Sequence, residues 1–186
     1  MTKKLWPPLA VSAILAATAI ALRAQGRMWF CDCGRFRLWT AEAWGAETSQ
    51  QLFDPYSFTH VLHGFAFAGL LALVAPKLAG RWRLTLAVAL EAVWEIAENT
   101  RYVIDRYREA TAALGYTGDT VVNSLGDIAA CGLGFEIARR LGLRLSLVAF
   151  ALVEIALLLW IRDSLLLNVL MLVYPLDSVR AWQANH

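Results

Sequence analysis

Residues 145–161, LSLVAFALVEIALLLWI, form an apolar run in which Glu154 is the only charged residue. An α-helix needs about 20 mostly apolar residues to cross the hydrocarbon core of a bilayer, so this run predicts a membrane span. Four similar runs predict four more spans, at residues 7–24, 57–76, 83–99 and 120–138. A shorter apolar run between Asp163 and Pro175 predicts a short sixth span, a re-entrant hairpin or an interfacial helix.

The composition of the whole chain agrees with a membrane protein. Of its 186 residues, 59% are hydrophobic and 17% are charged, and the mean hydropathy is +0.51. Soluble domains contain about 45–50% apolar and about 25% charged residues, so a disordered chain, a disulfide-dense mini-protein and most soluble folds are excluded. The spans lack the period-two alternation of a membrane β-barrel. The sequence therefore predicts an all-α, polytopic membrane helix bundle.

The predicted spans organise residues 1–186 as a single integral membrane domain. Residues 25–56 predict an outer cap loop, and residues 100–118 predict an outer interfacial loop or helix. The opposite side carries short segments dense in basic residues, which are Lys3, Lys4, Lys77, Arg81, Arg83, Arg139, Arg140 and Arg144. Positive charge favours the cytoplasmic side, so we expect a cytoplasmic N-terminus in a bacterial inner membrane and periplasmic long loops.

Polar side chains within the predicted spans gather on one side of the membrane. They begin the even-numbered spans and end the odd-numbered ones: His60, His63, Glu91, Glu95, Glu98, Asn99, Asp119, Asn123, Ser124, Asp127, Arg162 and Asp163. Spacings of three or four residues place three sets each on a common helix face: His60 with His63, Glu91 with Glu95 and Glu98, and Asp119 with Asn123 and Asp127. An ionised carboxylate in hydrocarbon costs at least about 2.5–3.5 kcal/mol. We therefore expect these side chains to share one polar cavity that opens toward the periplasm.

Side-chain chemistry suggests a role for each residue of this cavity. The candidate general acids and bases, and so the candidate catalytic residues, are Glu95, Glu98, Asp119 and Asp127. His60 and His63 are candidate metal ligands, and with neighbouring carboxylates they could hold a divalent cation such as zinc. The candidate substrate-binding residues are Asn99, Arg106, Arg108, Asn123, Ser124 and Arg162.

Several of these residues also have a purely structural interpretation. Asp119 follows Gly118 and could simply cap the N-terminus of the fourth span. Arg106 and Arg108 could belong to a basic belt on lipid headgroups instead of binding a phosphate beside the cavity. Arg162 could form an interfacial ion pair with the next residue, Asp163.

The first outer loop contains Cys31 and Cys33, separated by one residue. In an oxidising compartment the two thiols could form a disulfide with each other. Alternatively, they could join His60 and His63 in a Cys2His2 metal set. Cys131 lies within the fourth predicted span and is expected to be inert packing.

An ordered series of short motifs runs through the chain. The motifs are Cys31-x-Cys33-Gly34, Ser57-x-x-His60-x-x-His63-Gly64, Glu91-x-x-Trp94-Glu95-x-x-Glu98-Asn99, Arg106-Tyr107-Arg108, Tyr116-x-Gly118-Asp119-x-x-x-Asn123-Ser124-x-x-Asp127 and Arg162-Asp163-x-Leu165-x-Leu167-Asn168. In order and spacing the series resembles a family of uncharacterised bacterial inner-membrane proteins, known as domain of unknown function 2585 or uncharacterised protein family 0314. The resemblance covers about residues 25–183. It implies a multi-pass inner-membrane protein and no particular substrate.

Three classes of function fit these features. The cavity could belong to a metal-assisted or acid–base enzyme that acts on a lipid or lipid-linked substrate. It could instead bind or transport a small cation, for which Glu91 and Glu154 lie nearer the middle of the membrane. Third, the chain could be a membrane assembly factor without catalysis. The expected partners are membrane lipids and a second copy or another membrane protein, and the net charge of +2 gives no basis for nucleic-acid binding.

Overall fold

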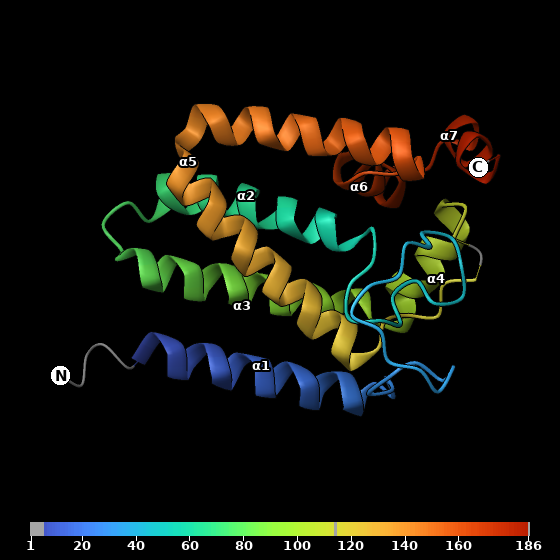
Figure 1. Cartoon of the computed structure of the whole chain (residues 1–186), viewed down its shortest axis with the longest axis horizontal. Helices are drawn as coiled ribbons and strands as arrows, with labels where there is room; N and C mark the ends of the chain where they lie inside the picture. The colour runs from blue at the N-terminus through green and yellow to red at the C-terminus, as the bar shows by residue number, and fades with distance from the viewer. Residues whose placement is uncertain (1–5, 114, 186) are drawn as a thin grey trace.

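The computed structural model describes residues 6–113 and 115–185, and its regular structure in that part of the chain is all helical. The helices are α1 (Trp6–Ala24), α2 (Ser57–Val74), α3 (Gly80–Glu98), α4 (Arg101–Ala110), α5 (Val121–Ile161), α6 (Leu165–Val173) and α7 (Asp177–Ala184). This confirms the all-α class. The long helices run along the length of the molecule, and α4, α6 and α7 gather at the end away from the N-terminus (Figure 1).

By length and composition, three of the described helices can cross a membrane: α1, α2 and α5. The sequence predicts five spans and a short sixth, and three of the described helices meet these criteria. The predicted third span corresponds to α3, which does not meet these criteria. It carries two arginines and three glutamates. The predicted fourth and fifth spans are joined in α5, which has 41 residues. The predicted sixth is α6, whose nine residues extend only about 14 Å.

The long helix α5 bends sharply at Gly142. Gly142 has φ 74° and ψ 170°, which lie outside the helical range and in a region that favours glycine. The second part of α5 runs back toward the end of the molecule where the helix begins (Figure 1). The bend therefore brings Arg162, at the end of α5, to the same end as the start of this helix.

Helices α2 and α5 pack closely because glycines face each other across their contact. A Cβ added at Gly64 of α2 would collide with the main-chain oxygen of Cys131. Conversely, a Cβ at Gly134 of α5 would collide with the main-chain oxygen of Val61. Small residues let helix backbones approach closely, which is a common way to join helices in membranes. This contact fixes the position of α2 relative to α5.

The segment 25–56 covers the end of the bundle without regular secondary structure, and main-chain hydrogen bonds hold it there. The N–H of Thr120 donates to the oxygen of Ser49 at 3.0 Å, and the N–H of Val121 donates to that of Met28 at 2.8 Å. A Cβ at Gly126 would collide with the main-chain oxygen of Leu52. The segment therefore lies directly on the beginning of α5.

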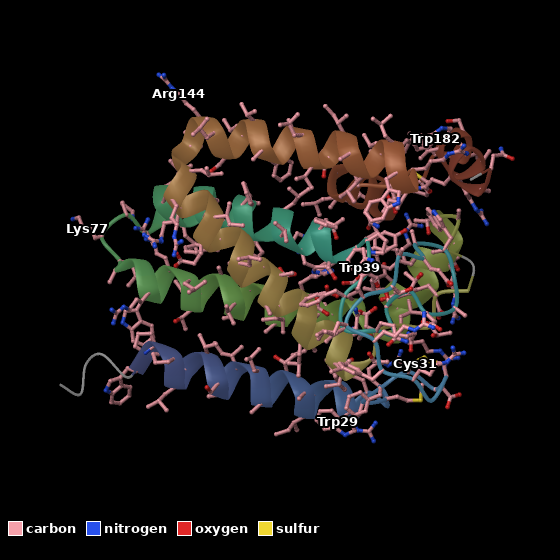
Figure 2. All side chains as sticks on the ribbon, in the orientation of Figure 1. Trp29, Cys31, Trp39, Lys77, Arg144 and Trp182 are labelled. Carbon is pink, nitrogen blue, oxygen red and sulfur yellow. A yellow bond between two sulfur atoms is a disulfide. The ribbon has the colours of Figure 1, made fainter. Side chains whose placement is uncertain are left out.

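The labelled side chains show that the two ends of the molecule differ (Figure 2). Lys77 and Arg144 lie at one end, whereas Trp29, Cys31 and Trp182 lie toward the other. Lys3 and Lys4, which contributed to the predicted orientation, lie outside the described residues.

The glycine contact gives a direct test of this packing. Gly64→Ala is expected to destabilise the protein by about 1–3 kcal/mol, because overpacking forces two backbones apart. Gly69→Ala on the same helix is the matched control, since a Cβ at Gly69 meets nothing within 4 Å. Thermal unfolding of both variants in detergent measures the difference. Equal unfolding temperatures for the two variants would contradict the packing described.

Candidate functional site

Two histidines near the start of α2 lie at the end of the bundle that the segment 25–56 covers. Before the helix, Asp54 Oδ1 accepts the N–H of Tyr56 at 2.7 Å, and Ser57 Oγ accepts the N–H of Asp54 at 3.2 Å. These bonds fix where the helix begins. His60 therefore falls in the first turn and His63 one turn later, so both imidazoles point to the same side of α2.

Both imidazoles face the carboxylate of Glu91 on α3. The Nδ1 atom of His60 lies 2.5 Å from Glu91 Oε1. The Nδ1 atom of His63 lies 2.9 Å from the same oxygen and 3.0 Å from Oε2. Glu91 has no solvent-exposed surface. A single buried carboxylate is thus shared by two imidazoles and ties α2 to α3.

Two further carboxylates reach His60 from other helix positions. Glu95 Oε1, one turn beyond Glu91, lies 3.3 Å from His60 Nδ1, and Asp127 Oδ2 of α5 lies 3.8 Å from His60 Nε2. Asp127 Oδ1 also accepts a hydrogen bond of 2.7 Å from the hydroxyl of Ser57. Glu95 is different, because neither of its buried oxygens has a hydrogen-bond partner among the described residues.

These side chains offer two overlapping sets of metal ligands. Ligand atoms of His60, His63 and Glu91 lie within 4.8 Å of one another, and so do those of His60, Glu95 and Glu98. The structure therefore brings the predicted histidine ligands together with carboxylates. His60 belongs to both sets.

Four residues of this cluster, His60, His63, Glu98 and Asp127, line a cavity of about 700 Å³. Its walls come from the segments 43–50, 111–113 and 115–117 and from helices α2, α3, α4, α5 and α6. Aromatic and apolar side chains line part of it, including Trp44, Phe67 and Trp94. Four acids also line it, which are Glu98, Asp119, Asp127 and Asp163. None of the described lining residues is Lys or Arg.

Asp119 is held at the cavity wall by α3 and by a neighbouring tyrosine. Its N–H donates to Asn99 Oδ1 at 2.7 Å, and its Oδ2 accepts from Asn99 Nδ2 at 2.8 Å. The hydroxyl of Tyr116 donates to Asp119 Oδ1 at 3.0 Å. Burial raises the pKa of Asp119 above its usual value. The N-cap of α5 is Thr120, so the interpretation of Asp119 as that cap is wrong.

The three polar candidates Asn99, Asn123 and Ser124 are buried and engaged with other protein groups. Asn99 Nδ2 lies 3.3 Å from Ser124 Oγ, in addition to its bonds with Asp119. Asn123 Nδ2 donates to the main-chain oxygen of Gln51 at 2.9 Å. These amides hold the loops that form the cavity, and their predicted contact with a substrate stays a prediction.

The arginine candidates lie outside the cavity lining. Arg106 Nε donates to the main-chain oxygen of Leu172 at 2.8 Å, which joins α4 to α6. Arg162 Nη1 donates to that of Trp182 at 3.0 Å, and its guanidinium lies over the Trp182 ring. Arg162 is thus turned toward α7 and forms no ion pair with Asp163 among the described residues. Arg108 Nε donates to the oxygen of Tyr116 at 2.5 Å.

The two cysteines of the segment 25–56 adopt the first of their two predicted arrangements, a disulfide. Cys31 and Cys33 form a disulfide with each other, so they do not complete a metal set with the histidines. Cys131 is a free, buried thiol in α5, as the prediction of inert packing requires.

Some residues that line the cavity were not predicted from the sequence as site residues. The sequence predicts Glu91 in the shared polar cavity, on the same helix face as Glu95, but singles it out only for cation transport. Tyr56, Tyr107 and Tyr116 line the cavity. Burial and the nearby Glu98 carboxylate raise the pKa of Tyr107 well above its usual value. Only the folded positions of α4 and of the irregular segments could reveal these tyrosines.

Asp163, one of the four acids that line the cavity, comes shortly after the end of α5. Its Oδ1 accepts the N–H of Ser164 at 2.9 Å, and its Oδ2 lies 3.4 Å from both the hydroxyl of Tyr56 and the amide of Asn168. Burial is the main cause that raises the pKa of Asp163 from 3.8 to about 7. The folded protein therefore holds this proton more tightly than the unfolded chain does.

The raised pKa of Asp163 predicts a specific dependence of stability on pH. Its stabilising contribution is complete below pH 3.8 and is lost as the pH rises toward about 7. In Asp163→Asn the side chain is neutral at every pH. As the pH rises across that window, the free energy of unfolding of the variant should therefore rise relative to that of the wild type, by at most about 1.4 kcal/mol per pH unit. Thermal unfolding of both proteins across this pH range measures the gain, with the exposed Asp105→Asn as control. Parallel curves for wild type and Asp163→Asn would contradict it.

Comparison with known proteins gives the same family as the motifs. Residues 22–185 match a family model described as a protein of unknown function, DUF2585. A UPF0314 protein of Paracoccus denitrificans is 45% identical over 98% of this chain and 95% of its own length. Another, from Novosphingobium aromaticivorans, is 44% identical over 95% of this chain and 92% of its own length. No solved structure matches. The chain therefore belongs to the DUF2585 family, to which the name UPF0314 is also attached.

Proposed function

We propose that this protein is a membrane-embedded enzyme that uses a divalent cation, such as zinc, held by His60, His63 and Glu91. The observation that carries the proposal is the convergence of both Nδ1 atoms on one buried carboxylate, with ligand atoms within 4.8 Å of one another. Two histidines and a carboxylate are a common ligand set of catalytic zinc, which keeps a further position for water or substrate.

The Glu95 carboxylate, which accepts no hydrogen bond among the described residues, supports a cation at this place. Both of its oxygens are buried without a hydrogen-bond partner among the described residues. A buried carboxylate that accepts no hydrogen bond is costly, and a nearby cation lowers that cost. Glu95 Oε1 lies 3.3 Å from His60 Nδ1, so a cation beside His60 would also lie beside Glu95.

The overall charge of the cavity supports the same conclusion. Glu91 and Glu95 contact His60, which lines the cavity with four more acids, and no Lys or Arg is among the described lining residues. Two imidazoles cannot balance six carboxylates unless several of them hold protons. A divalent cation would offset part of this excess, and the remaining protonated carboxyls would be available as acids.

The chain's own residues would then carry the proton transfers. A bound divalent cation lowers the pKa of a water molecule toward neutrality. Asp127 and Glu95 flank His60 from two helices and are placed to accept a proton as general bases. Glu98 and Asp119 line the same cavity and would donate a proton to a leaving group.

The walls of the cavity indicate an amphipathic substrate. Trp44, Phe67 and Trp94 offer apolar and aromatic surface, while the acids occupy other parts of the lining. Such a division suits a lipid or lipid-linked molecule with a polar head. Membrane lipids are therefore the partners that we propose.

We further propose that α3 and both parts of α5 cross the bacterial inner membrane together with α1 and α2. Residues 121–141 and 143–161 of α5 each extend about 30 Å, the thickness of the hydrocarbon core. The glutamates of α3 would face the cavity. The basic end around Lys77 and Arg144 would be cytoplasmic, as would the N-terminus, so the cavity would open to the periplasm.

The metal content of the purified full chain tests this proposal. We expect a single divalent cation per chain after purification, and at least about a tenfold loss of metal affinity in His63→Ala and Glu91→Gln. Glu136→Gln is the control, because Glu136 pairs with Arg139 at 2.7 Å on the surface of α5. Elemental analysis of monodisperse protein gives the result. Equal, substoichiometric metal in all of these proteins would refute the metal site.

The catalytic part of the proposal needs a separate test. A strain that lacks this protein should accumulate a lipid or lipid-linked species, and the wild-type gene should remove it. Glu95→Gln and Asp127→Asn should fail to do so although the variants reach the membrane in normal amounts, because each loses a base and keeps its shape. Comparative lipid analysis of the strains measures this. Full complementation by both variants would exclude this acid–base role.

A further inference from the structure

A second cavity, of about 500 Å³, lies beside the first at the same end of the molecule. Three arginines line it, Arg27, Arg101 and Arg108, together with one acid, Asp105. The two cavities therefore carry opposite charge: the first has acids and no Lys or Arg among its described lining residues, and the second has an excess of arginine.

Side-chain atoms of this second cavity have unused hydrogen-bonding capacity. Arg27 Nε is buried and has no hydrogen-bond partner among the described residues, although Arg27 Nη1 donates to the main-chain oxygen of Thr117. Arg101 is 96% exposed, and its Nε lies 3.9 Å from Asp105 Oδ2. An exposed pair at such a distance holds little energy, so the Arg101 guanidinium is available to a ligand.

The beginning of α4 adds main-chain donors to the same cavity. Thr100 caps this helix of ten residues, and Thr100, Arg101 and Ile104 all line the cavity. The first N–H groups of a helix have no partner within the helix and favour an anion. Guanidinium groups and main-chain N–H groups together are the usual ligands of phosphate.

The position of the cavity along the bundle favours a lipid headgroup. Gln25 and Arg27 follow the last residue of α1, and Asn99 to Arg101 follow the last residue of α3. In the topology proposed above, both helices leave the hydrocarbon at this height. That is the level of lipid phosphates in the outer leaflet.

We propose that the cavity around Arg27, Arg101 and Arg108 binds the phosphate group of an anionic amphiphile. Thr117 lines both cavities, so a molecule held by its phosphate here would place an adjoining part in the acidic cavity. The acids there repel phosphate and accept hydroxyl or amine groups. The phosphate site stands by itself, whereas the choice of a lipid and the link to a substrate rest on the topology and function proposed above.

Direct binding measurements test the phosphate site. The full chain in neutral detergent is titrated with short-chain phosphatidic acid and, separately, with inorganic phosphate. Arg101→Gln should weaken binding about tenfold, which corresponds to the loss of a charged hydrogen bond. Asp105→Asn should strengthen binding because it removes the one acid of this cavity. Arg35→Gln, an exposed arginine of the loop 25–56, is the control.

The two titrations also identify the source of the phosphate. Binding of the lipid alone supports a headgroup site, and equal binding of both supports a site for the free anion. Absence of binding to either ligand overturns the proposal, and so does unchanged affinity in both Arg101→Gln and Asp105→Asn. The metal content of the same samples separates the two proposals, because the metal site contains none of these residues. Phosphate binding without metal would leave this site in place and refute the metal centre.

Discussion

The buried carboxylate of Glu91 and the two imidazoles that face it hold the end of the bundle together. Glu91 has no exposure to solvent, and both histidines of α2 bring Nδ1 within 3.0 Å of it. Truncating one partner of such a group would leave a buried charge alone, which is strongly unfavourable. The glycine contact between α2 and α5 then brings Asp127 to the other side of His60. The positions of three helices are thus linked through one imidazole.

Apolar runs and helical spacing predicted much of this architecture. The predicted span 57–76 differs from α2 mainly at its end, and the span 7–24 agrees closely with α1. The number of spans was harder to predict, because a hydropathy profile evaluates each apolar run of the sequence separately. Residues 121–138 and 145–161 lie in the two helical parts of α5, which meet at Gly142, where the positive φ marks the turn. The glutamates of α3 are tolerated because they face other polar groups, which composition alone cannot show.

The centre of the candidate site was also predictable, but its walls were not. Spacings of three and four residues placed His60 with His63 and Glu91 with Glu95, since residues of one helix face must lie together. Asn99 and Asp119 are 20 residues apart and meet only because the segment after α4 returns to α3. The tyrosines of the cavity depend on similar returns of irregular chain. Arg162 was expected near the cavity but turns to α7, because its left-handed backbone, with φ 53°, redirects the chain.

Gly118 has a mechanical consequence for the two cavities. Its φ of 89° requires a glycine, and a Cβ there would collide with Arg27 Nη1. The guanidinium therefore rests directly on the peptide segment between Thr117 and Asp119. A displacement of Arg27 would therefore move the main chain that lies at most two residues from Asp119. If ligands occupy both cavities as proposed, this contact would couple their affinities, and thermodynamic reciprocity would require the same factor in both directions.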